Sequence, residues 1–367
     1  APNEEIICGV FNNLIINFND VISRSGNLIL CNISNPYGAR VYEKGLTFLF
    51  KVSALEVLGK NTVIKVRNSI DRGVFFETNK ELTEENIKEI KKIMKSKVDK
   101  ALTFEKIETT MNEAVNYFKG IKRDDKIKTL FYDKNKYVTL YKFDGVYNYF
   151  LGSLPHDSSV LKYYDLTLLP GKGIILRFPT MYDNGKIVKY THHEQFFNNV
   201  NEYLEWAKIL NISTVGELND AIVSMDAAEL INLSESIQDY RLQSIAGAIR
   251  DKKDKIKIIL LSGPSSSGKT TFAGKLGMSL KINGIKPVTI SVDNYFVERK
   301  DNPVDEHGNY DFECIEALDV ELFNRDLVDL LAGKEVELPT FNFAIGTKEY
   351  KGNKLKLAKD EILIIEG

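Results

Sequence analysis

The feature that most constrains this chain is the segment 263–271, which reads Gly-Pro-Ser-Ser-Ser-Gly-Lys-Thr-Thr. A β-branched apolar run at 256–261 precedes it, and residues 272–282 carry two leucines four apart before an Asn-Gly stop signal. This pattern predicts a buried parallel strand, a glycine loop and a helix in direct succession. A chance match in an ordinary loop is the alternative, but the flanking strand and helix favour a phosphate-binding loop.

The predicted loop supplies the groups that a polyphosphate needs. Backbone N–H groups of the loop and of the first helical turn lack intrahelical acceptors, and the helix dipole adds positive potential at that end. Gly263 and Gly268 let the backbone approach closely where a Cβ atom would clash. We expect Lys269 to reach the β- and γ-phosphates and the Thr270 hydroxyl to bind magnesium. The residues expected to contact the phosphates of a nucleotide are Gly263, Ser265, Ser266, Ser267, Gly268, Lys269, Thr270 and Thr271.

The composition is that of a globular protein with room for two or three domains. The chain has 367 residues, of which 43% are hydrophobic and 27% charged, and its net charge is −2. This balance does not favour a nucleic-acid or membrane partner, and no apolar run approaches the ~18 residues of a membrane span. The three cysteines are far apart in the sequence, which argues against a disulfide framework and against zinc. We therefore expect a cytoplasmic protein, with homo-oligomerisation left open.

Both ends of the sequence are abrupt. The chain begins at Ala1 without a methionine and stops at Glu366-Gly367, directly after a strand-like run. Because a domain rarely ends where a central strand reaches its functional edge, we expect a fragment whose C-terminal parallel sheet is incomplete.

Residues 1–195 predict an α+β domain. Short strand-like runs alternate here with helical patterns, and a hairpin is expected around Asp144-Gly145. A helix capped by Thr83 should have an apolar face rich in isoleucine. Its remaining surface carries lysines at 88, 91, 92, 95 and 97. Such a run could face RNA, but it is more typical of the solvated face of an amphipathic helix.

A helical connector is expected at 196–254, and it should lead into a phosphate-binding domain at 255–367. The connector ends in the charged run Asp-Lys-Lys-Asp at 251–254. Just before the connector, His192-His193-Glu194 raises the question of a metal. Adjacent side chains diverge on strands and on helices, so we do not expect a metal site there.

Two further strand ends are expected to meet the glycine loop. An alternating run at 287–292 leads to Asp293, and an apolar run at 361–365 leads to Glu366. Ligands of open parallel sheets bind beyond the carboxyl ends of the strands, so both acids should share an edge with Lys269. Asp293 is then the candidate to accept a proton from a substrate hydroxyl or to hold magnesium, unless it only caps a turn. Glu366 is suited to hold magnesium.

From Val215 onward the sequence resembles the uridine kinase and phosphoribulokinase family of P-loop kinases. The resemblance implies an ATP- and magnesium-dependent kinase that phosphorylates a hydroxyl, typically the 5′-hydroxyl of a nucleoside. It implies that Asp293 is the catalytic base, with Lys269 acting on the phosphates and Thr270 and Glu366 on magnesium. It also implies that three residues lie near the nucleoside, namely Tyr295, Asp311 and Phe312. The matching words are Gly-Pro-Ser-Ser-Ser-Gly-Lys-Thr-Thr (263–271), Ser-Val-Asp-Asn-Tyr-Phe (291–296), Tyr-Asp-Phe-Glu (310–313), Glu-Leu-Pro-Thr-Phe-Asn-Phe (337–343) and Ile-Ile-Glu-Gly (364–367).

One departure from that family concerns the acceptor. Uridine kinases carry a histidine that helps to read the base, followed by an arginine, whereas this chain has Gly346 and Lys348 in those places. The resemblance therefore implies kinase chemistry without implying selectivity for uridine. Another small hydroxylated metabolite, such as a sugar phosphate, is the alternative acceptor.

Residues from about 40 to 195 resemble the editing-type second domain of threonyl-tRNA synthetase. That domain normally carries a His-x-x-x-His pair and a cysteine four residues before a histidine; here His156 alone matches, and Gly152 stands in the cysteine's place. The resemblance thus implies a domain that positions a ligand or a partner, without editing or zinc. An ATP-switched RNA-binding protein is a third hypothesis. The matching words are Leu-Thr-Glu-Glu-Asn (82–86), Thr-Phe-Glu-Lys (103–106), Asn-Glu-Ala-Val-Asn-Tyr-Phe (112–118) and Leu-Pro-His (154–156).

Overall fold

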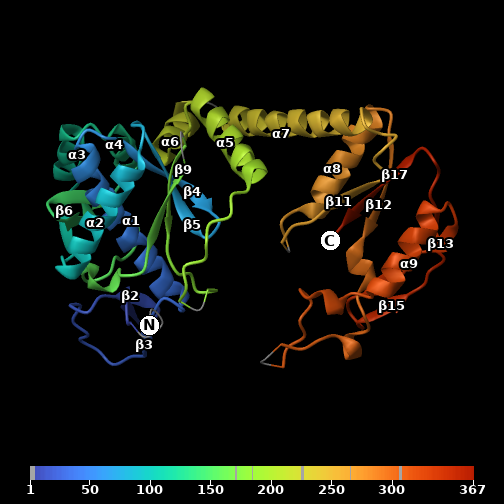
Figure 1. The fold of residues 1–367 in the computed structure, drawn as a ribbon, viewed down its shortest axis with the longest axis horizontal. Helices are drawn as coiled ribbons and strands as arrows, with labels where there is room; N and C mark the ends of the chain where they lie inside the picture. The colour runs from blue at the N-terminus through green and yellow to red at the C-terminus, as the bar shows by residue number, and fades with distance from the viewer. Residues whose placement is uncertain (1–4, 170–171, 184, 225–226, 265, 306–307) are drawn as a thin grey trace. The chain divides into compact units, whose positions relative to one another are not determined.

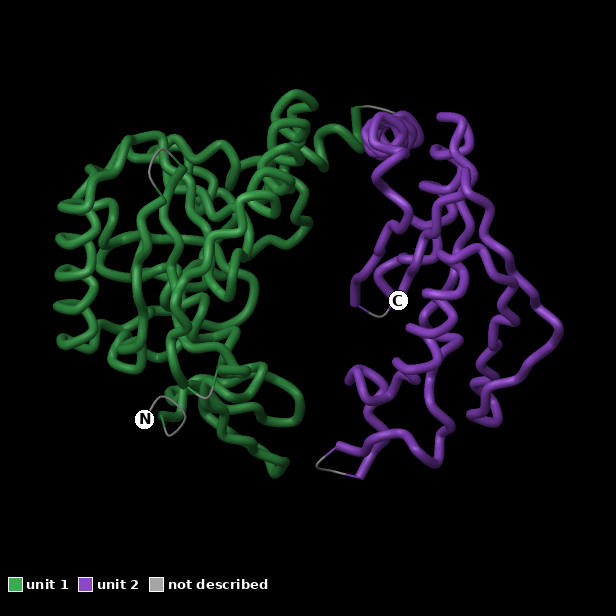
Figure 2. The backbone as a smooth tube through the Cα atoms, turned by 45° about the vertical axis from the view of Figure 1, so that its right-hand side comes forward, with its two compact units in different colours: residues 1–225 green, residues 226–367 purple. Residues whose placement is uncertain are grey.

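The computed structural model describes residues 5–169, 172–183, 185–224, 227–264, 266–305 and 308–367. The chain divides into two compact units, residues 1–225 and residues 226–367 (Figure 2). This division falls inside the predicted connector 196–254, whose helices are thus split between the units. The domain boundaries drawn from the sequence at 195 and 254 stay predictions.

Unit 1 consists of antiparallel sheets and helices, as its α+β sequence pattern indicates (Figure 1). One sheet has the order β2-β1-β3, with β1 at Cys8–Phe11, β2 at Leu14–Ile16 and β3 at Leu28–Cys31. Another has the order β4-β5-β10-β9, with β4 at Ile64–Ile70, β5 at Gly73–Thr78, β9 at Asp165–Leu169 and β10 at Gly173–Arg177. A further sheet has the order β6-β7-β8, with β6 at Glu105–Thr110, β7 at Tyr137–Phe143 and β8 at Val146–Tyr149. The helices are α1 (Pro36–Leu58), α2 (Glu84–Asp99), α3 (Met111–Gly120), α4 (Asp124–Phe131), the short η1 (Ser158–Val160), α5 (Glu194–Ile209) and α6 (Val215–Ser224).

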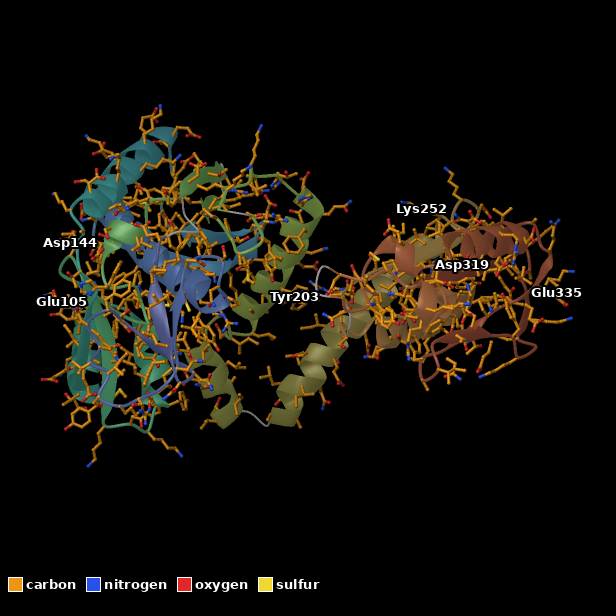
Figure 3. The ribbon with its side chains drawn as sticks, turned by 90° about the horizontal axis from the view of Figure 1, so that it is seen from below. Glu105, Asp144, Tyr203, Lys252, Asp319 and Glu335 are labelled. Atoms are coloured by element: carbon orange, nitrogen blue, oxygen red, sulfur yellow. The ribbon has the colours of Figure 1, made fainter. Side chains whose placement is uncertain are left out.

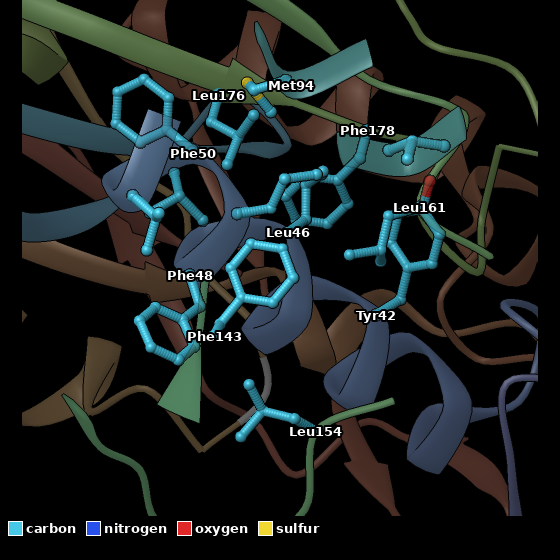
Figure 4. Close-up of a cluster of buried hydrophobic side chains, with 14 of the residues drawn as sticks. Tyr42, Leu46, Phe48, Phe50, Met94, Phe143, Leu154, Leu161, Leu176 and Phe178 are labelled. Atoms are coloured by element: carbon cyan, nitrogen blue, oxygen red, sulfur yellow. The ribbon is translucent and has the colours of Figure 1, made fainter. Parts of the chain in front are cut away.

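Helix α1 supplies the centre of the unit 1 core. It starts where Asn35 accepts a hydrogen bond from the Tyr37 amide, at a helix N-terminus that places proline at the first position. Its buried aromatic side chains pack with residues of α2, β7 and β10 in one apolar cluster (Figure 4). Phe48 contacts Phe143, with ring centroids 5.8 Å apart, and Phe143 stacks on Phe104 at 4.3 Å. Aromatic pairs at these separations add to the free energy gained by burial.

Helix α2 confirms the predicted cap and corrects one part of the lysine prediction. Thr83 and Asn86 form a reciprocal capping box at its start. Lys97, expected on the solvated face, is instead buried and paired with Glu56 and with Asp144. Asp144, labelled in Figure 3, lies in the predicted turn between β7 and β8. Helical periodicity could not show this, because both carboxylates come from distant parts of the sequence.

The cysteines Cys8 and Cys31 are distant in sequence but adjacent in the fold. They are direct cross-strand partners in β1 and β3, and both are buried free thiols. Burial, together with the neighbouring thiol, raises the pKa of Cys8 to about 12. The sequence argument from their separation therefore did not foresee this pair. Within the described segments, no helix combines the length and the apolar character that crossing a membrane requires.

Unit 2 contains the predicted parallel sheet, with strand order β11-β17-β12. The central strand β17 (Glu361–Glu366) is flanked by β11 (Ile258–Leu261) and β12 (Lys286–Ser291), and both pairings are parallel. The helices are α7 (Ala227–Arg250), α8 (Lys269–Ile282), the short η2 (Val292–Tyr295), η3 (Arg299–Asp301) and η4 (Ile315–Ala317), and α9 (Val320–Leu331). Two small antiparallel pairs join β13 (Glu335–Glu337) to β16 (Lys354–Lys356) and β14 (Thr340–Asn342) to β15 (Thr347–Glu349).

Strand β17 is buried on both faces. Ile362 and Ile364 pack with residues of α7 and α8, whereas Leu363 and Ile365 pack with residues that include Leu330 of α9. Successive side chains of a strand point to opposite faces, so this alternation places α7 and α8 on one side of the sheet and α9 on the other. The layers hold the ends of the three strands, where the candidate site lies.

We expect the substitution Leu363→Ala to destabilise unit 2 by about 2–5 kcal/mol, because it leaves a cavity beside a fully buried strand. Hydrogen exchange of the β17 amides reports this loss locally. The matched control is Leu260→Ala on β11, where the side chain is 76% exposed. A comparable loss of protection in both variants would contradict the layered packing described above.

Candidate active site

The loop between β11 and α8 adopts the expected tight turn. Gly268 has φ 86° and ψ 21° and forms the N-cap of α8, without a side-chain capping bond. Ser266 also has positive φ, 59°, and the Ser267 amide donates to the Pro264 carbonyl at 3.2 Å. The first-turn amides of α8 therefore face outward without a capping acceptor, as an anion site requires. Ser265 lies outside the described residues.

Gly263 has a steric role in this loop. A Cβ atom at this position would lie 2.9 Å from the Ser267 hydroxyl oxygen and 3.5 Å from Cγ of Lys269. Glycine therefore lets the two ends of the loop close on each other. The remaining loop residue of the predicted set, Thr271, is exposed in the first turn of α8.

The Lys269 side chain folds back over the loop. Its ammonium group donates to the carbonyl oxygens of Gly263 at 2.9 Å and of Pro264 at 3.3 Å. An ammonium group has three N–H donors and no acceptor, so it can exchange these carbonyls for phosphate oxygens. The site thus has a cation beside an anion-binding turn, and its present partners are two carbonyl oxygens of the loop.

Thr270 and Glu366 come together at the carboxyl edge of the sheet. The Thr270 hydroxyl donates to both carboxylate oxygens of Glu366, at 3.2 and 3.3 Å. Glu366 is only 6% exposed and lies in register with Leu261 of β11 and Ser291 of β12. The predicted edge is therefore present, with β17 between the two strands that carry the other candidate residues.

The oxygens of Thr270 and Glu366 fit magnesium, which takes hard oxygen ligands and usually keeps several waters. Among the residues described, no group of three or more His, Cys, Asp or Glu is arranged around a metal position. Phosphate oxygens and water would therefore have to complete the coordination. This is how magnesium is bound in nucleotide sites in general.

Asp293 lies in η2, immediately after β12. Its side chain is exposed, and among the described residues it has no hydrogen-bond or salt-bridge partner. The alternative in which Asp293 caps a turn thus has no supporting hydrogen bond. A carboxylate with free oxygens beside the sheet edge is available to a ligand hydroxyl.

Tyr295 occupies a different position from the one expected of a ligand contact. It is 1% exposed, its hydroxyl donates to Asp326 of α9 at 3.3 Å, and its ring packs edge-on against Phe323. Burial raises the pKa of this phenol. Tyr295 therefore anchors η2 to α9 and holds the turn that carries Asp293. Sequence alone did not show that this hydroxyl had a buried partner.

The other two predicted acceptor residues lie in the segment before η4. Asp311 accepts a hydrogen bond from the Glu313 amide at 2.9 Å, and Phe312 is partly exposed. Phe312 belongs to a group of rings in mutual contact, which we call the aromatic cluster. Its members are Phe296, Tyr310, Phe312, Phe341 and Phe343.

Of the aromatic cluster, only Phe312 was predicted to lie near the nucleoside. The signal was nevertheless present, because Phe296, Phe341 and Phe343 all stand inside the matching words at 291–296 and 337–343. In the structure, a hydrogen bond connects the segments 291–296 and 337–343. The Phe341 amide donates it to the Asn294 side chain in η2, at 3.2 Å. The cluster is thereby tied to the turn of Asp293.

Comparison with known proteins identifies the C-terminal region. Residues 258–367 match the model of the Phosphoribulokinase / Uridine kinase family. The uridine kinase of Ligilactobacillus salivarius is 29% identical over 117 residues, which cover 32% of this chain and 53% of that protein. The uridine kinase of Lactobacillus helveticus is 28% identical over 116 residues, which cover 32% of this chain and 54% of that protein.

A solved structure described as a possible uridine kinase from Bacillus stearothermophilus is also similar. It shares 26% identity, with a TM-score of 0.28, and the match covers 35% of this chain and 71% of that one. This chain spans about half the length of the curated relatives it matches. On the family match and the geometry of the sheet edge, residues 258–367 are a domain of the phosphoribulokinase/uridine kinase family.

Proposed function

We propose that unit 2 is a magnesium- and ATP-dependent kinase that phosphorylates the 5′-hydroxyl of a nucleoside. One observation supports this most directly. The ends of three parallel strands bring a glycine loop, a threonine–glutamate pair and an exposed aspartate to one edge of a sheet. In kinases of this kind, positioning and charge neutralisation contribute most of the catalysis.

Each residue has a distinct part in this proposal. ATP would supply the phosphoryl group, and magnesium would neutralise charge on its phosphates. The first-turn amides of α8 and the ammonium group of Lys269 hold the phosphate oxygens. Thr270 and Glu366 are the groups that would hold magnesium. Asp293 orients the acceptor hydroxyl and accepts its proton on a carboxylate oxygen.

The test of this function is ATP consumption by the full chain with magnesium, across a panel of nucleosides and sugar phosphates. Lys269→Ala is the background control. Phosphorylation of a nucleoside that Lys269→Ala abolishes supports the proposal. If only sugar phosphates were phosphorylated, the proposed acceptor would be a sugar phosphate and not a nucleoside. Absence of transfer to every acceptor, with ATP binding retained, would overturn the kinase assignment.

The role of Glu366 can be tested separately. We expect Glu366→Gln to raise the magnesium concentration needed for half-maximal ATP binding by about tenfold or more, because a neutral amide is a weaker magnesium ligand. The control is Glu335→Gln on β13, which removes an exposed salt bridge to Lys354. Equal magnesium requirements in both variants would remove Glu366 from the metal site.

We extend the proposal to unit 1, the cofactors, the location and the oligomeric state. The resemblance of residues 40–195 to the second domain of threonyl-tRNA synthetase suggests that unit 1 positions a ligand or partner. The family match of residues 258–367 supports ATP and magnesium as the proposed cofactors. A cytoplasmic location fits an enzyme that consumes ATP, and size measurement in solution would decide between a monomer and a homo-oligomer.

A further inference from the structure

The turn between β14 and β15 leaves no room for a side chain at Gly346. This residue has φ +72°, and its amide donates to the Asn342 carbonyl at 2.7 Å. A Cβ atom at Gly346 would lie 2.6 Å from Cβ and 2.7 Å from Nε of Arg299. Backbone conformation and the arginine stem therefore both require glycine here.

Arg299 fills the space beside this glycine. Its amide donates to the Gly346 carbonyl at 2.8 Å, which fixes the arginine backbone against the turn. Its Nη2 donates to the carbonyl oxygen of Phe343 at 2.5 Å. Phe343 is a member of the aromatic cluster and is 56% exposed. The guanidinium group thus lies at the margin of the ring surface that a ligand could contact.

Most of the guanidinium donors remain available. Arginine carries five N–H donors, and one protein acceptor for them is found among the described residues, the Phe343 carbonyl. No described residue forms a salt bridge with Arg299, although Glu298 and Asp301 are close to it in sequence. Planar N–H pairs of this kind suit the oxygens of a phosphate or a carboxylate.

Several charged groups near Arg299 have protein partners. Lys348 pairs with Asp319, and its amide donates to Glu298 at 3.2 Å. Burial opposes the charge on Asp319, but hydrogen bonds from Lys348 and the Leu322 amide outweigh it and hold the pKa of that carboxyl below its usual value. Asp311 accepts the Glu313 amide. Lys348 is therefore committed to the protein, whereas Arg299, beside the aromatic cluster, keeps N–H donors for a ligand.

We propose that Arg299 selects an acceptor that carries a phosphate or carboxylate group next to the part that lies on the aromatic cluster. This proposal rests on the proposed kinase function and names the acceptor class of the same site. The reaction is unchanged: the acceptor oxygen forms a bond to the γ-phosphorus, the bond to ADP breaks, and the proton goes to Asp293. The anion takes no part in the transfer and only orients the acceptor.

Two matched pairs of acceptors test the proposal on the full chain. Orotidine is uridine with a carboxylate on the ring, and ribose 5-phosphate is ribose with a phosphate. We expect at least one anionic member to exceed its neutral partner by about tenfold or more in kcat/KM, since hydrogen bonds to charged groups are the stronger ones. A preference for orotidine over uridine would indicate a carboxylate as the preferred anion, and a preference for ribose 5-phosphate over ribose would indicate a phosphate.

Variants then assign the preference to this side chain. Arg299→Ala should lower kcat/KM for the anionic acceptor by about tenfold or more and leave the neutral acceptor unchanged. Arg299→Lys keeps the positive charge but loses the paired N–H donors of the guanidinium group. Its kcat/KM for the anionic acceptor should lie between those of the original protein and Arg299→Ala. Lys300→Ala removes the exposed neighbouring cation and should have no effect. Should Arg299→Ala fail to fold, Arg299→Gln keeps the stem and a donor for the Phe343 carbonyl.

Different experimental outcomes would contradict the role of Arg299 and the kinase function. Neutral acceptors that match or exceed the anionic ones, with Arg299→Ala unchanged in preference, would overturn the proposal while the kinase stands. If no acceptor is phosphorylated, equilibrium binding of orotidine and ribose 5-phosphate decides the matter. Weaker binding in Arg299→Ala, with Lys300→Ala unaffected, would support the anion site, and equal binding in both would refute it.

Discussion

Replacement of Lys269 by alanine is expected to lower the rate of phosphoryl transfer by about 10²- to 10³-fold, the usual cost of losing one group that stabilises developing charge. The ammonium group now lies over the glycine loop, where it holds two carbonyl oxygens, and no other cation of the described loop can take its place. ATP affinity should also fall, since the same group contacts the phosphates of the bound nucleotide. Transfer kinetics and titration with ATP measure the two effects separately.

The matched control for this prediction lies on the same helix. Lys275 of α8 forms a salt bridge with Asp239 at 3.4 Å, away from the loop. Lys275→Ala should therefore leave both ATP affinity and transfer rate unchanged. Similar losses in the two variants would show that α8 had been perturbed as a whole, and full activity in Lys269→Ala would refute the assignment.

Asp293→Asn is expected to reduce kcat by about 10²- to 10⁴-fold, the range that a positioned general base contributes. The amide keeps the size of the side chain but does not accept a proton. Because Asp293 is exposed and has no partner among the described residues, its replacement should leave stability nearly unchanged. ATP affinity should remain within about twofold, since in this proposal Asp293 acts on the acceptor hydroxyl.

A control carboxylate on α9 separates this effect from a general change in charge. Asp329 pairs with Lys334 at 2.7 Å and is remote in sequence from the strand ends. Asp329→Asn should retain full kcat. If Asp293→Asn also retained full kcat, the base would have to be sought elsewhere. If it lost ATP affinity instead, Asp293 would belong to the magnesium site.

Local patterns in the sequence predicted a large part of unit 2. The succession of strand, glycine loop and helix, the parallel sheet and the Asp319 cap of α9 all depend on residues close together in the chain. The convergence of Asp293 and Glu366 on one edge followed from a general property of parallel sheets. These features share a physical basis in hydrogen-bond periodicity and strand direction.

The features that sequence reasoning missed depend on contacts between distant segments. Lys97 is buried because Glu56 and Asp144 meet it there, and Tyr295 is buried because Asp326 of α9 accepts its hydroxyl. The Gly346 position looked like the loss of a side chain, whereas the structure shows that Arg299 occupies the space. Composition and periodicity carry no information about such partners.

The two-sided burial of β17 has a consequence for how this strand finds its alignment. A shift by one residue moves every side chain to the opposite face, but here both faces would still receive Ile or Leu. Apolar packing therefore discriminates only weakly between the two alignments. The polar residues at the two ends of β17 distinguish the correct alignment from the shifted one. Glu361 accepts a hydrogen bond from the Ala358 amide at 2.7 Å, and Glu366 accepts one from the Thr270 hydroxyl. Glu366, whose carboxylate is proposed to bind magnesium, would then also be one of the two residues that fix the register of β17.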